Sequence, residues 1–570
     1  MLNKKTLFYL LILIIVSFFL RFYKVGQLPS GVLPDEASFG YNAYSILKTG
    51  KDEYGVSFPL IFKAFGDQKL PAYVYATVPS IKLFGLNNFS IRLPSVIAGV
   101  LIVLAIFFLL LGLGFTIELS FIGALIASTS QWSIILSRFT FESNLGLLFF
   151  MIGILLSLIS SKKNKLLPAI LAGFFFGLTW YSYISYRLIT PLIVLIFLII
   201  YMRKNKFINK KGVILLIAFI MTISPLLLSS FANQGQARLK QAGLNANLGT
   251  VLEINENRTF CTHYLPKVVC YASANKILFN SRSLFYRYIT TFSPNYLFMT
   301  GDKNEKYINV DHFGLLPIIS LPFYFFGFIY LWSLFIEKRL SKNELFLVLS
   351  LIVTPFPSLF VGDPQKIRLS ALLPFLIILI MYGFRHLEKY LKKHINYIIY
   401  VAVVTLLILF SLFFMINFLT VHVQKYEISY STYVHKLMNY LGSFNKKTSI
   451  YIGSITESPI LYAYVNKIDP TIFQKLAIRK QPDSIGFTHI INLGNLHVTE
   501  RNIEEIYCQT IKNNWQTLYI TNEDLVKIGR IKKATKIIRS ENNVDTLAFV
   551  YDVKDIDKIN IDCSYINENR

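Results

Sequence analysis

Charged residues are scarce in this sequence. Asp, Glu, Lys and Arg make up 16% of the 570 residues, whereas hydrophobic residues make up 54%. Ordinary soluble domains carry about 25% charged residues, so a soluble chain of this composition would expose too much apolar surface. Long apolar runs with few charges, such as "LLILIIVSFFL", are the signature of transmembrane helices. The composition, with a mean hydropathy of +0.50, therefore indicates a membrane protein.

Acidic residues are fewer than basic ones, and almost all of the difference lies in residues 1–420. The chain has 57 Lys and Arg against 32 Asp and Glu, a net charge of +25. Residues 421–570 hold 19 basic and 16 acidic residues, or +3, which leaves +22 for the apolar part. Basic residues beside apolar helices are typical of cytoplasmic loops. The excess is therefore a topological signal and does not indicate a nucleic-acid-binding protein.

Two signatures of other protein classes are missing from the sequence. We find no internal repeat, so the inverted repeats of many transporters are absent. Residues 421–570 contain no phosphate-cradling glycine loop and no His or Cys set with metal-ligand spacing. No compact ligand cluster elsewhere in the sequence demands a metal, and we predict that no cofactor is required. A divalent ion held by carboxylates and a phosphate is the alternative.

Apolar segments of near-spanning length occur eleven times. The first follows Lys4 and Lys5, and it is long for a signal peptide and lacks a small-residue cleavage site, so we expect an uncleaved span. The predicted spans lie near residues 6–22, 91–113, 118–136, 143–160, 166–181, 188–202, 212–230, 313–336, 343–361, 369–385 and 396–419.

The loops between these spans predict the topology. With a cytoplasmic N-terminus, the inside segments carry 17 Lys and Arg, and the short outside loops "SRFTFE", "SYISYR" and "GDPQKIR" carry four. This predicts a multi-pass cell-membrane protein, mostly α, with residues 23–90, 231–312 and 421–570 outside. We divide it into a membrane domain, 1–420, and an extracytoplasmic α/β domain, 421–570.

Both the cysteines and the C-terminal pattern agree with an exterior location. All four cysteines, Cys261, Cys270, Cys508 and Cys563, fall in outside segments, as an oxidising compartment allows. Cys261 with Cys270 is the favoured disulfide because the loop is short, and unpaired thiols are the alternative. The stretches "TSIYIGSI", "THIINLG", "NWQTLYIT" and "TLAFVYDV" read as strands, with helices between some of them. The simplest role of this domain is packing or acceptor presentation.

The first outside loop contains "LPDEASFGYNAY". Pro34 favours a helix start, and the helix is expected to run to Gly50. Asp35 and Glu36 then lie in its first turn, where the helix dipole keeps a carboxylate ionised. An ionised carboxylate at a membrane face can take a proton from an incoming hydroxyl. Plain N-terminal capping is the alternative.

A second helix is predicted to begin at Pro71. Its aromatic, amphipathic body would lie in the membrane interface, with Tyr73 and Tyr75 at the headgroup level. Lys69, just before it, could meet a lipid phosphate, although lysines routinely snorkel to this level without a ligand. Arg92 in "IRLPS" stands at the start of the second span, where a charge is tolerated.

This order of motifs resembles the GT-C membrane glycosyltransferases. A first span, Asp-Glu opening a loop helix, Lys-x-Pro opening an amphipathic helix and "IRLPS" entering the second span are similar to the bacterial dolichyl-phosphate-mannose-protein mannosyltransferase and aminoarabinose transferase families. The resemblance covers about residues 6 to 420. Three more stretches match in part, with Arg138 and Glu142 in "SRFTFESN", His312 in "VDHFG", and Lys366 and Arg368 in "GDPQKIRL". Relatives commonly have Asp in place of Glu142 and an Arg-His pair near His312.

The resemblance implies a polyprenyl-phosphate sugar donor and an external acceptor hydroxyl on protein, lipid or glycan. Asp35 would be the general base of an inverting displacement, supported by Glu36 and Glu142. Neighbouring helical residues diverge by about 100°, so Asp35 and Glu36 cannot flank one bond as in covalent catalysis. The cations expected at the donor phosphate are Lys69, Arg138, Lys366 and Arg368. Tyr41 and His312 are candidates for lining the site.

Two other classes stay open from the sequence. A transporter or flippase of lipid-linked sugars would need polar residues within its spans, but the charges collect at the outer face. A non-catalytic scaffold would leave the C-terminal domain as the working part.

Overall fold

The computed structural model describes residues 3–64, 67–163, 165–204, 207–229, 248–303, 305–360, 362–445, 447–453, 458–481, 488–511, 516–540, 546–557, 561 and 563. They form two compact units, Met1–Tyr23 with Ser95–Asn417, and Lys24–Pro94 with Phe418–Arg570. The first outside loop therefore shares a unit with the C-terminal residues.

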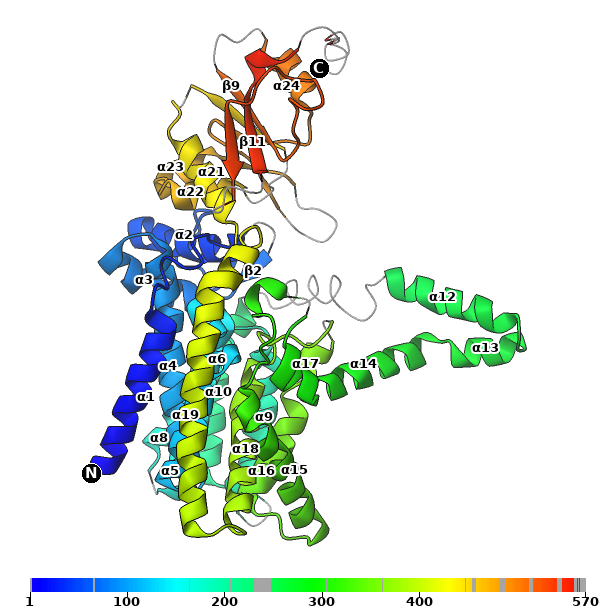
Figure 1. Ribbon diagram of the computed structural model, residues 1–570. Coiled ribbons are helices and arrows are strands. Elements are labelled where there is room, and N and C mark those ends of the chain that lie inside the picture. The colour runs from blue at the N-terminus through cyan, green and yellow to red at the C-terminus, as the bar shows by residue number, and fades with distance from the viewer. Residues whose placement is uncertain are drawn as a thin grey trace. The chain divides into compact units, whose positions relative to one another are not determined.

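The first unit consists of apolar helices that run side by side (Figure 1). Each of the eleven predicted spans lies on one or more of them. Their bounds are α1 Lys4–Phe22, α4 Asn88–Gly112, α5 Ile117–Thr129, α6 Gln131–Arg138, α7 Glu142–Lys162, α8 Leu167–Thr179, α9 Tyr186–Tyr201, α10 Lys210–Leu228, α15 Leu321–Ile336, α16 Lys342–Val353, α17 Phe356–Leu359, α18 Leu373–Glu388 and α19 Lys393–Asn417. The helix α4 begins in the other unit.

Seven helical segments among the described residues are long and apolar enough to cross a membrane, or eight if α5 and α6 count as one span. The helices α5 and α6 meet at 55°. Ser130 ends α5 in an extended conformation and its side chain accepts a hydrogen bond from Ser133 N at the start of α6. The remaining predicted spans fall on shorter helices, since α8 has 13 residues, α9 has 16 and α16 has 12. The multi-pass membrane architecture is confirmed, and the count of eleven stays a prediction.

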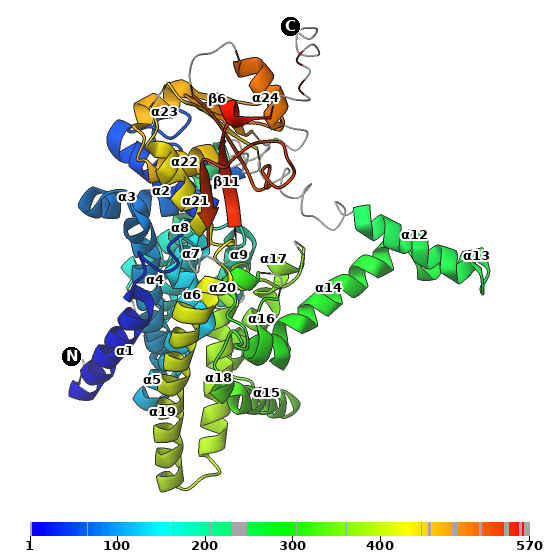
Figure 2. The ribbon, with the colours of Figure 1, turned by 45° about the horizontal axis from the view of Figure 1, so that its top comes forward.

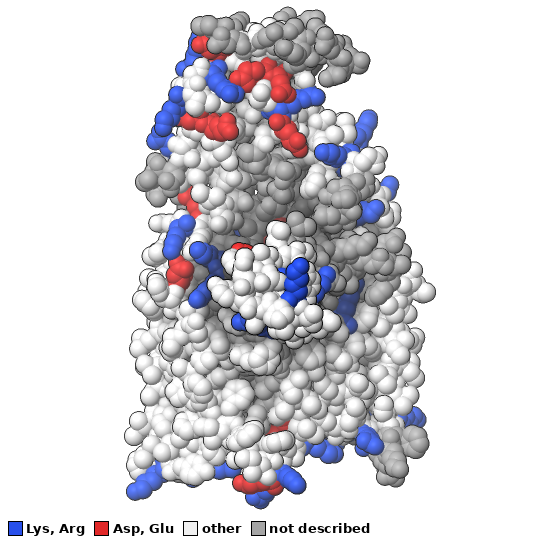
Figure 3. All heavy atoms as spheres, turned by 90° about the vertical axis from the view of Figure 1, so that its right-hand side faces the viewer, with Lys and Arg blue, Asp and Glu red and all other residues white. Residues whose placement is uncertain are grey.

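Exposed charge on the face of this unit that Figure 3 shows gathers near its edges. Figure 3 shows Lys and Arg side chains gathered along its lower rim, below a broad band with almost no charge. Such a band is what contact with hydrocarbon requires. Three further helices, α12 Leu248–Thr262, α13 Lys267–Ser273 and α14 Lys276–Phe292, extend away from the others (Figures 1 and 2).

The second unit combines the first outside loop with the C-terminal residues. Its loop part holds α2 Pro34–Thr49, α3 Pro71–Phe84 and the hairpin β1 Phe62–Ala64 and β2 Asp67–Lys69. Its C-terminal part holds the helices α20 Val423–Lys425, α21 Thr432–Gly442, α22 Ser458–Val465, α23 Pro470–Leu476 and α24 Ile503–Thr510.

A seven-stranded mixed sheet forms the core of the C-terminal part. Its order is β10-β11-β9-β5-β8-β7-β6, and β5 is parallel to both β8 and β9 while the other pairs are antiparallel. Ile450, Leu518 and Val550 from its central strands are fully buried. The strands are β5 Ser449–Ile452, β6 Ala477–Arg479, β7 Ile490–Leu493, β8 Leu496–Val498, β9 Thr517–Thr521, β10 Lys536–Arg539 and β11 Thr546–Asp552. The four predicted strands are confirmed as β5, β7, β9 and β11.

Candidate active site

The helix α2 begins and ends where the sequence predicts. Leu33 is extended, Pro34 fills the first helical position, and Gly50 ends the helix at φ 69°, a conformation that glycine adopts without strain. Asp35 and Glu36 lie in the first turn, about 100° apart around the helix axis. Their carboxylates therefore enter different surroundings.

Asp35 pairs with Lys69, which precedes α3. The Lys69 ammonium donates to Asp35 Oδ1, and it lies 5.4 Å from the centre of the Phe39 ring. The Lys69 side chain is 6% exposed, whereas the Asp35 side chain is 61% exposed. The pair thus has a buried cation that orients an accessible carboxylate, as a base for an incoming group requires.

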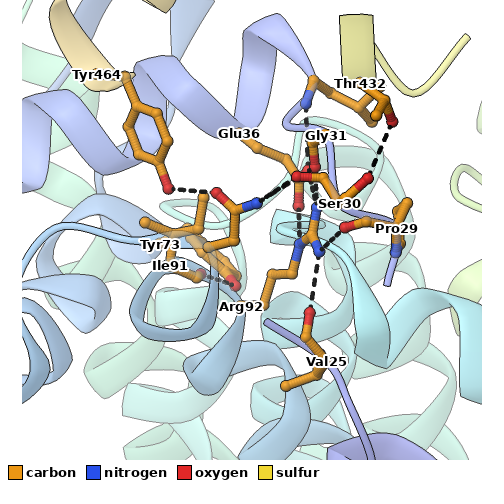
Figure 4. Close-up of polar contacts among 12 residues, drawn as sticks. Val25, Pro29, Ser30, Gly31, Glu36, Tyr73, Ile91, Arg92, Thr432 and Tyr464 are labelled. Atoms are coloured by element: carbon orange, nitrogen blue, oxygen red, sulfur yellow. Dashed lines mark hydrogen bonds and ion pairs between the residues drawn. The ribbon is translucent and has the colours of Figure 1, made fainter. Parts of the chain in front are cut away.

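Glu36 belongs to a buried ion pair with Arg92 (Figure 4). Arg92 Nε donates to Oε1 at 3.0 Å and Nη2 to Oε2 at 2.9 Å, a bidentate geometry. The same guanidinium donates to the carbonyls of Val25 at 3.0 Å, Pro29 at 2.9 Å and Gly31 at 2.8 Å. Glu36 is 2% exposed and Arg92 is fully buried. The carboxylate is thus committed to holding the start of α2 against the preceding loop.

The far side of α2 is covered by α22. Tyr464 donates to Asn88 Oδ1 at 2.9 Å, at the start of α4 (Figure 4). A side chain on Gly40 would meet the Tyr464 ring at 2.9 Å and Ile91 at 2.7 Å, so only glycine permits this approach. Tyr41 is fully buried and donates to Ile468 O at 3.0 Å, and burial raises the pKa of its phenol. Tyr41 therefore joins α2 to the C-terminal residues, where the sequence had suggested a site-lining side chain.

The helix α3 also packs on α2, and Tyr73 lies in this contact. Tyr73 is fully buried, its ring centre is 5.4 Å from that of Phe39, and its hydroxyl donates to Ile91 O at 3.0 Å. Tyr73 therefore packs its ring on α2, and its level relative to the lipid headgroups stays a prediction. Tyr75 is half-buried and donates to Pro59 O at 2.9 Å.

A buried carboxylate near the end of α2 escaped the sequence analysis. Glu53 is 2% exposed, and burial raises its pKa to about 8. Asn42 Nδ2 lies 3.4 Å from Glu53 Oε2, and Arg479 Nη2 donates to the Glu53 carbonyl at 2.9 Å. Acidic residues are usually exposed to water, so the sequence offered little reason to expect a buried Glu53. The hydrophobic residues that flank "KDEYG" were the available signal.

In the helical unit, Lys366 is fully buried. Its ammonium donates to Ile308 O, and its backbone N–H donates to Asp302 Oδ2 at 2.9 Å. Trp132 Nε1 donates to the Lys366 carbonyl at 2.9 Å. Burial lowers the pKa of Lys366 from 10.5 to about 8 and raises that of Asp302. A lysine in this position holds the chain together and does not present its charge to solvent.

Asp302 is the second acid that the sequence analysis missed. Tyr296 donates to Asp302 Oδ1 at 2.9 Å, and the Asp302 N–H donates to Asn309 Oδ1 at 3.1 Å. Gln131 Nε2 donates to the same Asn309 oxygen at 2.6 Å. Asp302 and Asn309 of the stretch "GDKNEKYINVDHFG" therefore belong to a buried polar network, and the acidic and amide residues of the stretch were the available signal.

The other predicted cations and acids lie as follows. Arg138 is fully buried, and its Nη1 donates to the carbonyls of Arg21 at 3.2 Å and Tyr23 at 2.9 Å beyond the end of α1. Glu142 is half-buried at the first position of α7. Arg368 is half-buried. The placement of Arg138 matches a cation on helix-terminal carbonyls, an arrangement that the helix dipole favours.

His312 and the cysteines complete the predicted set. His312 is exposed and has a φ of 65°, so it lies in a turn. The sulfur atoms of Cys261 and Cys270 are bonded, as are those of Cys508 and Cys563. Across the part of the chain that the structure describes, no three His, Cys, Asp or Glu side chains come together as a metal site would require. The catalytic and phosphate-binding roles of all these residues stay predictions.

Comparisons with known proteins agree with this architecture. Residues 68–228 match the family model described as dolichyl-phosphate-mannose-protein mannosyltransferase. None of the curated proteins matches the chain in sequence.

Two solved structures share its fold over most of the chain. ArnT from Cupriavidus metallidurans, bound to undecaprenyl phosphate, is 9% identical with a TM-score of 0.54, covering 95% of this chain and 97% of that one. The Archaeoglobus fulgidus oligosaccharyltransferase in its apo form is 13% identical with a TM-score of 0.51, covering 91% and 70%. The resemblance predicted from the sequence is therefore confirmed, and the chain has the fold of the GT-C membrane glycosyltransferases.

Proposed function

We propose that this protein moves a sugar from a polyprenyl-phosphate donor to an acceptor hydroxyl at the outer face of the membrane. The observation that carries the proposal is the Asp35–Lys69 pair, an accessible carboxylate on a buried cation at the first turn of α2. The match of residues 68–228 to a mannosyltransferase family supports the reaction class. The undecaprenyl phosphate bound by ArnT supports a donor of the same lipid class.

The chemistry is an inverting displacement. The acceptor oxygen attacks the anomeric carbon, the bond from that carbon to the phosphate oxygen breaks, and the polyprenyl phosphate leaves with the bonding electrons. Asp35 takes the hydroxyl proton. A cation beside the leaving phosphate stabilises the charge that develops there. Lys69 is our candidate for that cation, since its ammonium already meets Asp35, whereas Lys366 and Arg138 donate to backbone carbonyls. The expected role of Arg368 stays a prediction.

The ion pair of Glu36 with Arg92 contributes by positioning. It fixes the turn that carries Asp35, and it leaves neither Glu36 oxygen without a hydrogen bond. A base held by a rigid helix start needs no rearrangement at the moment of attack.

The test uses the full chain in lipid vesicles, with a panel of labelled polyprenyl-phosphate sugars and native membrane extract as acceptor. We expect Asp35→Asn to lower transfer about 100-fold or more, the usual effect of losing a general base. Glu500→Gln is the matched control, because it neutralises an exposed carboxylate in the C-terminal part. Equal transfer by wild type and Asp35→Asn would remove Asp35 from the mechanism. Absence of transfer by the wild type with every donor would contradict the proposed reaction.

A further inference from the structure

The helical arm, which we define as α12, α13 and α14, leaves the other helices of its unit (Figures 1 and 2). The disulfide between Cys261 at the end of α12 and Cys270 in α13 closes its far end. Arg258 Nε also donates to Ala274 O at 2.7 Å across this end. The arm is therefore a tied structure of its own.

Large apolar side chains on the arm are exposed. In α14, Ile277 is 78% exposed and Phe285 is 66% exposed. The remaining exposed members are Val251, Leu252, Phe260, Tyr264, Leu265, Val268, Val269, Tyr271, Leu278, Tyr286 and Ile289. Soluble surfaces seldom present so much contiguous apolar area, and each such side chain left in water forgoes about 1.5–3 kcal/mol of burial. The arm therefore needs a covering partner.

Most of the apolar residues of α14 fall on one face, and Phe279 and Tyr286 lie outside it. At about 100° per residue, Ile277, Leu278, Phe285 and Ile289 lie within a single arc. Ser283 lies about 160° from Phe285 on the opposite face. A helix of this kind binds along an interface between apolar and aqueous phases.

The same face continues into a surface of the membrane-spanning helices. Tyr288, Ile289 and Phe292, at the end of α14, line an apolar cavity of about 980 Å³ together with residues of α15 and α16. The exposed Trp332 and Phe335 of α15 line it too. The helix α15 lies in a segment apolar enough to span a membrane. The surface between α15 and the end of α14 is therefore apolar, so lipid that contacts α15 also contacts α14.

Charge distinguishes a lipid surface from a second copy of the chain. Between residues 248 and 292 there are five cations, Arg258, Lys267, Lys276, Arg282 and Arg287, and two anions, Glu253 and Glu256, a net charge of +3. Figure 3 looks toward the arm and shows Lys and Arg side chains on and around it. Pairing two copies of the arm would bring like charges together, whereas anionic headgroups attract them.

We propose that the helical arm lies in the interface of the bilayer, with the apolar face of α14 among acyl chains and Lys267, Lys276 and Arg282 against anionic headgroups. Arg258 and Arg287 already have partners within the protein, the Ala274 carbonyl and Asp363 respectively. The arm then acts as a lateral anchor for the loop between α10 and α15. This inference is independent of the proposed sugar transfer, since it concerns only lipid contact.

The experiment uses the full chain with p-benzoylphenylalanine in place of Phe285 or, as the matched control, Ser283. Each protein is reconstituted in vesicles of phosphatidylcholine and phosphatidylglycerol without polyprenyl lipids, irradiated, and analysed by mass spectrometry. We expect phospholipid adducts at position 285 to exceed those at 283 about tenfold, because only the first lies on the apolar face. We also expect phosphatidylglycerol to be enriched in the adducts, and Lys276→Gln with Arg282→Gln to abolish the enrichment.

Three results would overturn the proposal. Crosslinks from position 285 to a second copy of the chain would identify a protein interface. Equal adduct yields at 283 and 285 would deny the arm a lipid-facing side. Absence of lipid adducts at both positions would place the arm in water.

Discussion

Lys69 and Lys366 have the same expected role and very different surroundings. Lys69 ends β2 shortly before α3, Lys366 lies in the turn before α18, and both are almost completely buried. Lys69 meets an exposed carboxylate, Asp35. Lys366 meets the Ile308 carbonyl and lies in the network of the buried Asp302. The sequence thus suggested the same role for two cations, and only their partners distinguish a charge beside an accessible carboxylate from one that holds the chain together.

The contact of Lys69 with Asp35 depends on a rigid first turn of α2. Disrupting that turn should therefore have the largest effect on stability. Glu36→Gln leaves the Arg92 guanidinium buried without its counterion, and we expect a loss of about 3–5 kcal/mol in the free energy of unfolding. Denaturation of the purified full chain in micelles measures this loss. Asp35→Asn, at the exposed neighbour, should stay within about 1 kcal/mol of wild type. Similar losses in both variants would contradict the division of roles.

The pH dependence of stability should distinguish the buried Lys366 from an ordinary lysine. Because its pKa is about 8 when folded and 10.5 otherwise, the unfolded chain binds more protons between these values. Stability should therefore rise with pH across this window and be unaffected by this group below it. The gain is about 3 kcal/mol. Measuring the free energy of unfolding of wild type and Lys366→Met from pH 7 to pH 10.5 isolates this gain. The same pH dependence in both proteins would refute the lowered pKa.

Exchanging each lysine for methionine tests the comparison directly. We expect Lys69→Met to lower sugar transfer about 100-fold, as the loss of one charge-stabilising donor does. Lys366→Met should change transfer per folded molecule less than about threefold, because its ammonium donates to a backbone carbonyl. Transfer assays normalised to folded protein measure both. A larger loss in Lys366→Met would invert the assignment.

The smallest effect is expected where the C-terminal residues contact α2. Tyr464→Phe removes the hydrogen bond to Asn88 while keeping the ring against Gly40, and we expect a loss of about 1 kcal/mol in the free energy of unfolding. Gly40→Ala is the stronger variant, since its methyl group would overlap that ring. Denaturation of both variants measures the two losses in the free energy of unfolding. An unchanged free energy of unfolding in Gly40→Ala would show that α22 does not pack closely on α2.

Local chemistry explains what the sequence predicted. Pro34 and Gly50 bound α2, Pro71 begins α3, and short runs of apolar, β-branched and aromatic residues marked four strands, because these signals act within a few residues. The contact of Lys366 with Asp302 and that of Arg479 with Glu53 could not be predicted, since these partners lie 64 and 426 positions apart in the chain. The short strands β6, β8 and β10 escaped for the same reason, as neighbours in the sheet define them.

The hydrogen bond from Tyr41 to Ile468 joins residues 427 positions apart. A ribosome that has released α2 must still produce most of the chain before the residues that cover this helix exist. The translocation machinery must then deliver them to the same side of the membrane. A growing chain therefore carries Asp35 on a helix that α3 covers and that the C-terminal residues do not yet cover, and assembly of this part of the molecule waits for the last residues to be made.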